Sequence, residues 1–294
     1  MKHPFLPLRS LDNLWFQVSG TLCNLRCHHC FISCSPENDK FGFLTLADVK
    51  ARLDESRTLG VKEYYFTGGE PFANREMIPI LEETLRYGPA TVLTNGTLIS
   101  PQSAQRLAMI TEASDYSLEI RVSIDGFSPD TNDPIRGEGT FVRAMKGVKN
   151  LVEAGLLPII TAMRSWEIQD DESFLAGFRK TLKDIGYDRP RLKLLPSLKL
   201  GAEALRTRGY TETEMVTEEM MVGYDTDQLL CANSRIVTDK GVYVCPILID
   251  SPDAKLGDSL QDGLNGYQLR QKACYTCWQF GAICSNTTAK PREA

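Results

Sequence analysis

Three cysteines near the start of the chain stand close enough in sequence to hold one metal cluster. Cys23, Cys27 and Cys30 lie in the run Cys-Asn-Leu-Arg-Cys-His-His-Cys. Thiolates are the usual ligands of iron–sulfur clusters, and three of them can hold three irons of a four-iron cubane. The fourth iron would then lack a protein ligand and could chelate an amine and a carboxylate. The spacing therefore predicts an iron–sulfur cluster with one open iron.

Two other sites are compatible with these residues. Two of the cysteines could bind a structural zinc ion together with His28 or His29. Alternatively, Cys34 could supply a fourth thiolate, because the last two cysteines of the run and Cys34 have a ferredoxin-like spacing. The first interval of the run is one residue too long for that pattern. We therefore prefer Cys34 as a small, partly buried residue.

A second group of cysteines lies near the end of the chain, at Cys231, Cys245, Cys274, Cys277 and Cys284. The nine cysteines are an odd number, and no signal peptide is visible, so a disulfide framework is not expected. Grouped thiols in such a chain more often hold metal. The Cys-x2-Cys pair within this group is also found in zinc ribbons, which remain an alternative.

Strand-like and helix-like segments alternate between Trp15 and Pro196, and this pattern predicts the fold. Six strands are expected, at 15–19, 62–67, 91–94, 118–124, 158–162 and 191–195, separated by helices. Parallel strands need such crossovers, which are almost always right-handed. Six units are too few to close an eight-stranded barrel. We therefore predict an α/β fold, a partial (β/α)6 TIM barrel with a small C-terminal module.

Several polar motifs follow the predicted strands, where ligand sites of such folds lie. Gly68-Gly69-Glu70-Pro71 follows the second strand: its glycines let the backbone approach a ligand, and its carbonyls and carboxylate can accept from an ammonium. The other candidates at strand ends are Asn95, Ser123, Asp125, Arg136 and Arg164.

These motifs together resemble the radical S-adenosylmethionine superfamily, whose cysteine signature has this spacing and an aromatic position that His29 fills. The resemblance implies that the first three cysteines hold a [4Fe-4S] cluster with an open site. S-adenosylmethionine would bind there and be cleaved reductively to a 5′-deoxyadenosyl radical that abstracts a substrate hydrogen. It also implies that Gly68–Pro71 hold the methionyl amine, and that the other strand-end residues contact the cofactor.

The distal cysteines resemble the twitch module, a shortened relative of the SPASM domain. The full SPASM pattern needs seven cysteines for two clusters, so the resemblance implies one auxiliary [4Fe-4S] cluster. Its expected ligands are Cys231, Cys245, Cys274 and Cys277, with Cys284 as a possible replacement. The predicted organisation is a barrel over 1–200, a linker or last helix over 201–230, the module over 231–286 and a tail over 287–294.

An auxiliary cluster favours a two-electron oxidation, for which a general base would be needed. Asp250 and Asp253, near the auxiliary ligands, are weak candidates. Because few residues precede the first strand, we expect a small-molecule substrate, with a ribosomally made peptide as the alternative. A non-enzymatic iron–sulfur or zinc protein is a further alternative. Electrons would come from a reductant such as flavodoxin or ferredoxin.

Composition limits the other partners. The 33 basic and 38 acidic residues give a net charge of −5, which disfavours nucleic-acid binding. No apolar run approaches the ~18 residues that span a bilayer. The chain has only three histidines, so neither a histidine-dependent catalytic triad nor a His-rich zinc site is expected. We therefore expect a cytoplasmic enzyme that binds neither nucleic acid nor membrane.

Overall fold

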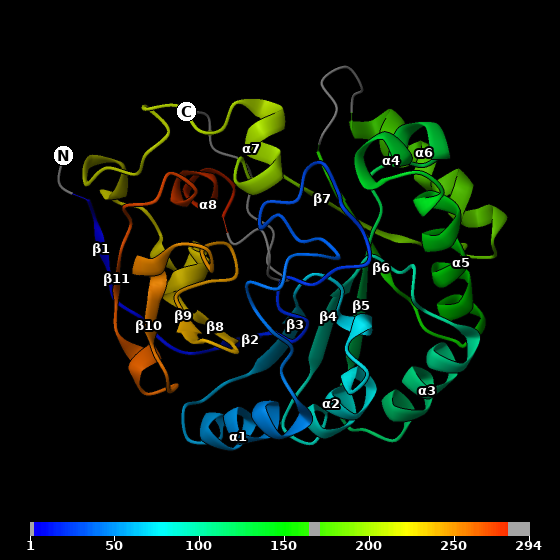
Figure 1. Ribbon diagram of the computed structural model, residues 1–294, viewed down its shortest axis with the longest axis horizontal. Coiled ribbons are helices and arrows are strands. Elements are labelled where there is room, and N and C mark those ends of the chain that lie inside the picture. Colours follow the sequence, from blue (N-terminus) through cyan, green and yellow to red (C-terminus); the bar gives the residue numbers. More distant parts are fainter. Residues whose placement is uncertain (1–2, 165–170, 282–294) are drawn as a thin grey trace.

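The centre of the molecule is a parallel sheet whose strands follow one another in sequence and in space (Figure 1). The computed structural model describes residues 3–164 and 171–281. The six successive parallel strands are β2 (Asn13–Gln17), β3 (Glu63–Thr67), β4 (Ala90–Thr94), β5 (Leu118–Ser123), β6 (Ile159–Met163) and β7 (Arg191–Leu195). They match the six predicted strands, and the predicted partial (β/α)6 barrel is confirmed.

Helices between these strands cover the outer face of the sheet. They are α1 (Leu46–Ser56), α2 (Met77–Thr84), α3 (Pro101–Glu112), α4 (Pro129–Arg136), α5 (Thr140–Glu153) and α6 (Asp171–Asp184). The local sequence explains where several of these helices begin. Thr45 and Asp48 form a reciprocal capping box before α1, and the Ser100 side chain accepts from Ser103 N–H before α3.

The sequence predicts that Asn74 caps the second helix and that residues 263–272 form a short helix, and the structure differs at both places. Asn74 was expected to cap the second helix, but α2 begins at Met77, and the Asn74 amide instead donates to the carbonyls of Val18 and Leu44. Asn74 thereby links two loops instead of starting a helix. In the C-terminal segment the expected helix over 263–272 is also absent. The helix there is α8 (Cys274–Phe280), which begins at a cysteine.

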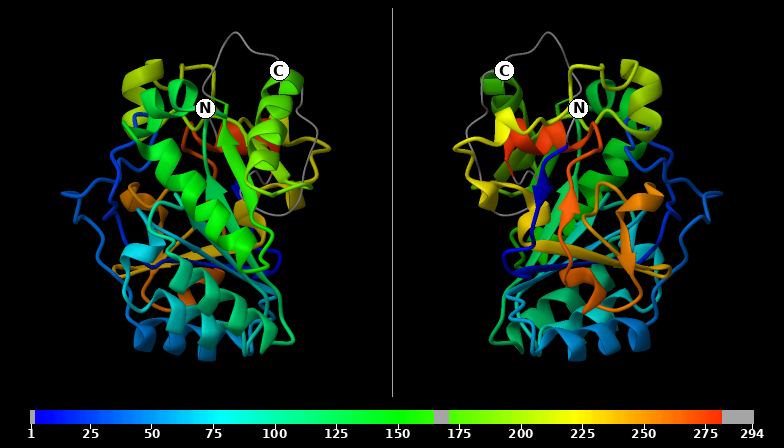
Figure 2. Two further views of the ribbon diagram at one scale, coloured as in Figure 1. Left: turned by 90° about the vertical axis from the view of Figure 1, so that its right-hand side faces the viewer. Right: turned by 90° about the vertical axis from the view of Figure 1, so that its left-hand side faces the viewer.

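The C-terminal segment continues the main sheet on the other side of β2. Its first strand, β8 (Ser234–Thr238), pairs in parallel with β2 and forms a hairpin with β9 (Gly241–Tyr243), as the turn-forming run at 239–241 predicts. β10 (Lys255–Gly257) completes the nine-stranded sheet, and the chain between β7 and β8 contains α7 (Gly201–Thr207). A separate pair, β1 (Phe5–Leu6) with β11 (Tyr267–Gln268), joins the N-terminal segment to this region (Figure 2).

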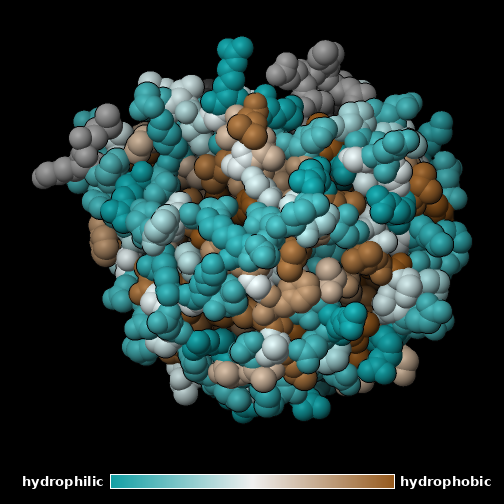
Figure 3. Space-filling model, viewed as in Figure 1, coloured by the Kyte–Doolittle hydropathy of each residue, from teal (hydrophilic) through white to brown (hydrophobic). Residues whose placement is uncertain are grey.

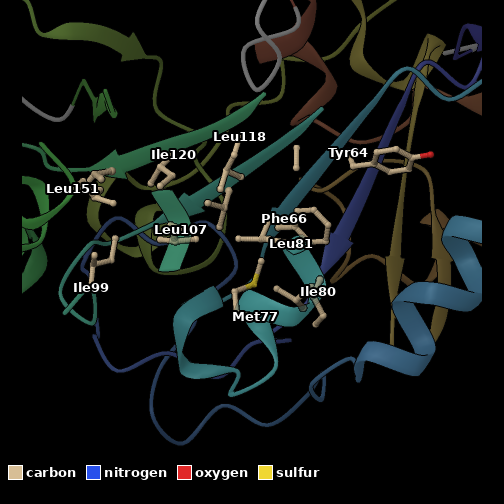
Figure 4. Packing of buried hydrophobic residues seen from close by; sticks show 14 of the residues in the cluster. Tyr64, Phe66, Met77, Ile80, Leu81, Ile99, Leu107, Leu118, Ile120 and Leu151 are labelled. Atoms are coloured by element: carbon tan, nitrogen blue, oxygen red, sulfur yellow. The ribbon is translucent and has the colours of Figure 1, made fainter. Parts of the chain in front are cut away.

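Two apolar cores lie on the two faces of the sheet. Leu14 and Phe16 of β2 pack with the helices in the larger core, part of which is shown in Figure 4. Trp15, between them on the same strand, points to the opposite face because side chains alternate along a strand. It stacks on Tyr65 with ring centroids 4.3 Å apart. The second core, to which both rings belong, also contains the buried Cys34 and distal cysteines.

Hydrophilic side chains cover most of the face shown in Figure 3, with hydrophobic residues visible between them. Among the described residues, no helix combines the length and the apolar character needed to cross a bilayer.

Candidate functional site

One cavity at the C-terminal ends of the barrel strands gathers most of the predicted cofactor residues. It offers about 1140 Å³ of empty space, part of which is continuous with solvent. Its lining includes the predicted residues Cys23, Cys27, Cys30, His29, Gly68, Gly69, Asn95, Ser123 and Arg136. These residues come from loops far apart in sequence, so the fold brings together what the motifs predicted. Four predicted residues, Glu70, Pro71, Asp125 and Arg164, are not part of the lining.

The cysteine loop is held in place by backbone hydrogen bonds from several directions. Cys23 N–H donates to the Ser35 carbonyl at 3.1 Å, which closes the loop on itself. His28 N–H donates to the Ile135 carbonyl at 2.8 Å, so α4 supports the middle of the loop. Its end is supported by α7, where Ala202 N–H donates to the Cys30 carbonyl at 2.9 Å.

The three thiols differ in their surroundings. Burial raises the pKa of Cys23 to about 12 and that of Cys27 to about 11. The pKa of Cys30 is lowered to about 6, because the Cys34 thiol and backbone N–H donate to its sulfur and outweigh its burial. The N–H contact measures 3.2 Å. Cys34 is buried, lines the same cavity and thus lies beside the predicted ligands.

The two glycines after β3 allow the turn to pack directly against the cysteine loop. A Cβ atom on Gly69 would lie 2.0 Å from the Leu22 carbonyl oxygen, and one on Gly68 would lie 2.2 Å from Ser19 Oγ. Gly68 also has a φ of +141°, which side chains rarely adopt. We expected these glycines to allow a ligand close to the backbone. In the structure they also allow the chain to approach itself, which fixes the turn beside Cys23.

Glu70 is fully buried, and its carboxylate binds the protein itself. It accepts hydrogen bonds from the Thr94 hydroxyl at 2.6 Å, from Asn95 N–H at 2.7 Å and from Phe72 N–H at 3.0 Å. Burial raises the pKa of this carboxyl, and these bonds oppose the rise. The carboxylate thus links the ends of β3 and β4, and its expected contact with an ammonium stays a prediction. Pro71 is buried and begins a 3₁₀ turn.

Asp125 joins three parts of the site at a buried position. Its Oδ2 lies 2.6 Å from His29 Nε2 and 2.5 Å from Arg136 Nε, and its Oδ1 accepts from Met163 N–H at 2.7 Å. Burial alone would raise the pKa of Asp125, but Arg136 and His29 outweigh it and hold that pKa well below its usual range. The alternation of side chains along a strand predicts that Asp125 shares one cavity-facing surface with Ser123. Only Ser123 lines the cavity, and Asp125 orients its neighbours.

Three further predicted residues lie outside the cavity. Arg164 forms an exposed ion pair with Asp171. Asp250 forms an ion pair with Lys40 at 2.6 Å, also at the surface. Asp253 accepts from the Gln271 amide at 3.0 Å and pairs with Arg270. None of the three candidates lines either of the cysteine-containing cavities, so the geometry does not support the base role considered for the two aspartates.

The distal cysteines line a second cavity that is otherwise apolar. Cys231, Cys245, Cys274 and Cys277 surround about 360 Å³ of empty space, together with side chains such as Leu229, Val244, Ile247, Tyr267 and Leu269. These are the four expected auxiliary ligands, and three of them, Cys231, Cys245 and Cys274, interact electrostatically. Cys284 lies outside the described residues. Cys245 lines this cavity, and the next residue, Pro246, lines the larger one.

Neither cavity has the geometry of a site for a single ion. Among the described residues, no group of three or more His, Cys, Asp or Glu side chains is placed to hold one metal ion. Sulfur atoms that bind different corners of a cubane stand further apart than sulfur atoms that share one ion. In each of the two cavities several cysteines line one shared space.

Three site residues were missed from the sequence. Trp15 lines the larger cavity, and its Nε1 has no hydrogen-bond partner among the described residues. Pro246 forms part of the same wall. Arg235 is fully buried and its Nη1 donates to the backbone carbonyl of Cys231 at 2.8 Å, and burial lowers its pKa to about 10. For Trp15, the alternation of side chains along its strand could have suggested a position that faces the cavity. Pro246 and Arg235 carry no such signal, because tertiary packing determines where they lie.

Comparison with known proteins identifies the family. The sequence profile of the Radical SAM superfamily matches residues 18–174, just over half of the chain. The mycofactocin maturase MftC of Mycobacterium tuberculosis (strain CDC 1551 / Oshkosh) is 35% identical over 134 residues, covering 45% of this chain and 32% of that protein. The subtilosin biosynthesis protein AlbA of Bacillus subtilis (strain 168) is 29% identical over 154 residues, covering 50% and 33%.

A further relative and a solved structure are also similar to this chain. The GTP 3',8-cyclase of Petrotoga mobilis (strain DSM 10674 / SJ95) is 30% identical over 159 residues, covering 51% of this chain and 46% of that enzyme. This chain thus spans about a third to a half of the length of these curated relatives. The solved structure of native anSMEcpe with bound AdoMet has the same fold, with a TM-score of 0.61 at 16% identity over 85% of this chain and 80% of that one. The chain belongs to the radical S-adenosylmethionine superfamily, whose members use a [4Fe-4S] cluster and S-adenosylmethionine.

Proposed function

We propose that this chain binds a [4Fe-4S] cluster through Cys23, Cys27 and Cys30 and uses it for a radical oxidation of a peptide side chain. The observation that carries the proposal is that these three cysteines share one cavity with Gly68, Gly69 and the other cofactor candidates. When bound, the cluster and S-adenosylmethionine supply the 5′-deoxyadenosyl radical that removes a substrate hydrogen. The protein supplies the position of the cofactor and a cavity that limits water.

Each neighbouring residue has a definite part in that positioning. Asp125 fixes the ring of His29 through Nε2, so the ring nitrogen Nδ1, which has no partner among the described residues, stays available to a ligand. Arg136 brings a positive charge to the same cavity, where it can face a carboxylate. Asn95 donates to the Asn24 side chain at 2.9 Å, which ties the end of β4 to the cysteine loop.

We further propose an auxiliary [4Fe-4S] cluster on Cys231, Cys245, Cys274 and Cys277, which line one cavity. After hydrogen abstraction, a two-electron oxidation also requires the substrate radical to lose one electron and one proton. Cys245 and Pro246 are consecutive residues that line the two cavities, so a cluster held by the distal cysteines would lie close to the larger cavity and could accept that electron. This geometry supports oxidation over rearrangement.

Two of the relatives favour a peptide as the substrate. MftC is named as a maturase of mycofactocin, and AlbA as a biosynthesis protein of the bacteriocin subtilosin. The expectation of a small-molecule substrate rested on the short segment before β2, and the matches to these two maturases do not support it. The larger cavity offers an apolar wall of Leu195, Pro196 and Leu198 to an apolar side chain.

Anaerobic reconstitution tests the proposal. We expect about eight irons per chain, and formation of 5′-deoxyadenosine when dithionite and S-adenosylmethionine are added. Replacing Cys23, Cys27 and Cys30 by Ala should abolish cofactor cleavage and leave about four irons. Replacing Cys231 and Cys245 by Ala should leave cofactor cleavage intact. A reconstituted protein with two clusters that never forms 5′-deoxyadenosine would overturn the proposed function.

The substrate class needs a separate measurement. The reconstituted chain can be incubated with precursor peptides encoded next to its own gene, and the products analysed by mass spectrometry. We expect a loss of two mass units from a peptide, because two hydrogens leave in a two-electron oxidation. Turnover of a small alcohol or amine in place of every peptide would contradict the peptide assignment, while leaving the cofactor chemistry in place.

A further inference from the structure

The strand β7 forms one edge of the nine-stranded sheet, and this edge is open. Within the described residues β7 pairs only with β6, in a regular parallel register that ends at Met163 and Leu195. All five residues of β7 keep part of their surface exposed, whereas the middle three residues of β6 are buried. One side of β7 therefore has no neighbouring strand in the part of the chain that the structure describes.

The backbone groups that face this open side can be assigned. Arg164 N–H donates to the Leu195 carbonyl at 2.8 Å, so the backbone of Leu195 faces β6. In a β-strand the N–H and C=O of one residue point to the same side, and those of the next residue point to the opposite side. Leu192 and Leu194 thus direct both groups away from β6, and no described residue bonds these groups. They repeat at the spacing of an extended chain.

The other edge of the sheet is protected against pairing. β10 is three residues long, and its register with β9 shifts between Lys255 and Gly257. Short or irregular edge strands resist pairing with another chain, whereas a long regular edge is a template for one. β7 has neither a register shift nor a proline over 191–195, and the side chain of Arg191 reaches back across the sheet to Glu119. The row of Leu192 and Leu194 is therefore left unprotected.

The open edge leads directly into the larger cavity. Leu195 and the next residue, Pro196, line that cavity, and Leu198 continues the same wall. Pro196 has no N–H, so a ladder along this edge loses its next donor at the cavity. A chain that pairs with Leu192 and Leu194 would therefore leave the strand there. Its adjoining residues would enter the space that also contains the predicted cofactor residues.

We propose that the substrate peptide binds as an added strand on the edge of β7, where it pairs with the backbone of Leu192 and Leu194. The inference rests on the proposed function, because it takes the substrate to be a peptide. A small molecule lacks the repeating amide groups that such an edge pairs with, whereas an extended peptide carries them at the same spacing. Backbone pairing supplies affinity, and the cavity then selects the side chain of the adjoining residue.

Hydrogen exchange of the reconstituted full chain tests the proposal. The probe is the precursor peptide that is modified in the substrate assay. We expect the amides of Leu192 and Leu194 to exchange quickly in the free chain and at least about tenfold more slowly with saturating peptide. The amides of Lys193 and Leu195 face β6 and are the internal controls, because they should exchange slowly in both states. Mass spectrometry with electron-transfer fragmentation resolves the single residues.

Two substitutions at one position separate the backbone donor from the side chain. Leu194→Pro removes the outward N–H, whereas Leu194→Ala shortens the same side chain and keeps that N–H. We expect Leu194→Pro to raise the KM for the peptide about fivefold, which is the effect of one lost hydrogen bond. Leu194→Ala should stay within about twofold of the parent, because its side chain faces the helices. Equal increases in both variants would assign the effect to packing and contradict the added strand. If Leu194→Pro does not fold, the exchange experiment on the parent chain still decides.

The other outcomes separate this inference from the proposed function. If the peptide is modified but exchange at Leu192 and Leu194 does not change, the proposed function remains and the added strand is refuted. Slow exchange at both amides before peptide is added would also refute it, because the edge would already be paired. Size-exclusion chromatography then shows whether a second copy is the partner. If no peptide is modified, the peptide assignment and this inference fail together, and formation of 5′-deoxyadenosine still tests the cofactor chemistry.

Discussion

At the scale of single residues, Asp125 holds the polar residues beside the cavity in place through its hydrogen bonds. It has a buried partner in each of His29 and Arg136, and it also accepts from Met163 N–H. Removing one member of a buried ion pair leaves an uncompensated charge, which costs more than the pair contributed. The sequence placed Asp125 correctly at a strand end, but it could not show that protein groups would use the carboxylate.

We expect Asp125→Asn to lower the free energy of unfolding by about 3–5 kcal/mol at neutral pH, because Arg136 then stays buried without its counter-charge. Urea unfolding followed by circular dichroism measures this change. Asp171→Asn, which removes the partner of Arg164 from an exposed pair, is the matched control and should cost less than about 1 kcal/mol. Equal losses in both variants would contradict the buried-pair argument.

The same variant has a defined pH dependence. The native pKa of Asp125 is depressed below that of an unfolded aspartate, which is about 3.9. Its contribution to stability is therefore fully present above about pH 5, and it is lost as the pH falls toward the native pKa. The stability difference between the parent and Asp125→Asn should shrink as the pH falls below about pH 4. Unfolding curves at these pH values check the trend.

Cys34 tests whether the first cluster is open or closed. Because its N–H donates to Cys30 Sγ, we interpret Cys34 as a neighbour of a ligand. In a chain that already carries Cys231→Ala and Cys245→Ala, adding Cys34→Ala should leave about four irons and normal formation of 5′-deoxyadenosine. If the added change removes the iron, Cys34 is a fourth ligand and no iron is open.

At the scale of elements, the turn after β3 and the cysteine loop fit together through Gly69. Gly69→Ala would place a Cβ 2.0 Å from a backbone oxygen that cannot move without shifting Cys23. We expect destabilisation of about 1–3 kcal/mol and reduced iron incorporation. The measurements are iron content and thermal unfolding.

A matched glycine substitution serves as the control for that experiment. Gly42→Ala would meet only the Asp239 side chain, at 3.1 Å, and this flexible carboxylate can move aside. It should retain the iron content of the parent. If Gly69→Ala also kept full iron content, the turn would not be needed to position the cysteine loop.

The elements themselves were largely predictable, and the reasons are local. The consecutive aromatic residues Tyr64, Tyr65 and Phe66 indicate a buried strand, and Thr45 is a helix-capping residue type just before α1. The short α4 was not predicted, because Pro134 lies inside it. The partners of Glu70 were also not predictable, since its bonds to β4 depend on tertiary packing.

At the scale of the whole molecule, the C-terminal segment is part of the barrel sheet. β8 pairs along most of β2, and the second core includes side chains from both ends of the chain. The division into a barrel and a separate module was a prediction made from the grouping of cysteines. No local signal reveals that a distant strand will pair with the first strand of the barrel.

A chain that ends at Leu230 should therefore fold poorly. It would expose the edge of β2 and leave Trp15 and Tyr65 without much of their packing, which favours aggregation. Size-exclusion chromatography and circular dichroism of the truncated protein check this expectation. A soluble, monomeric product with a native melting transition would show that residues 1–230 form an independent domain.

The shared wall at Cys245 and Pro246 has a consequence for evolution. Cys245 lines the distal cavity, and the next residue in the chain, Pro246, lines the larger cavity. A mutation that reshapes the wall at Pro246 to admit a larger substrate would also displace the sulfur atom of Cys245. In the proposed enzyme, substrate selectivity and the redox properties of the distal cluster would therefore change together.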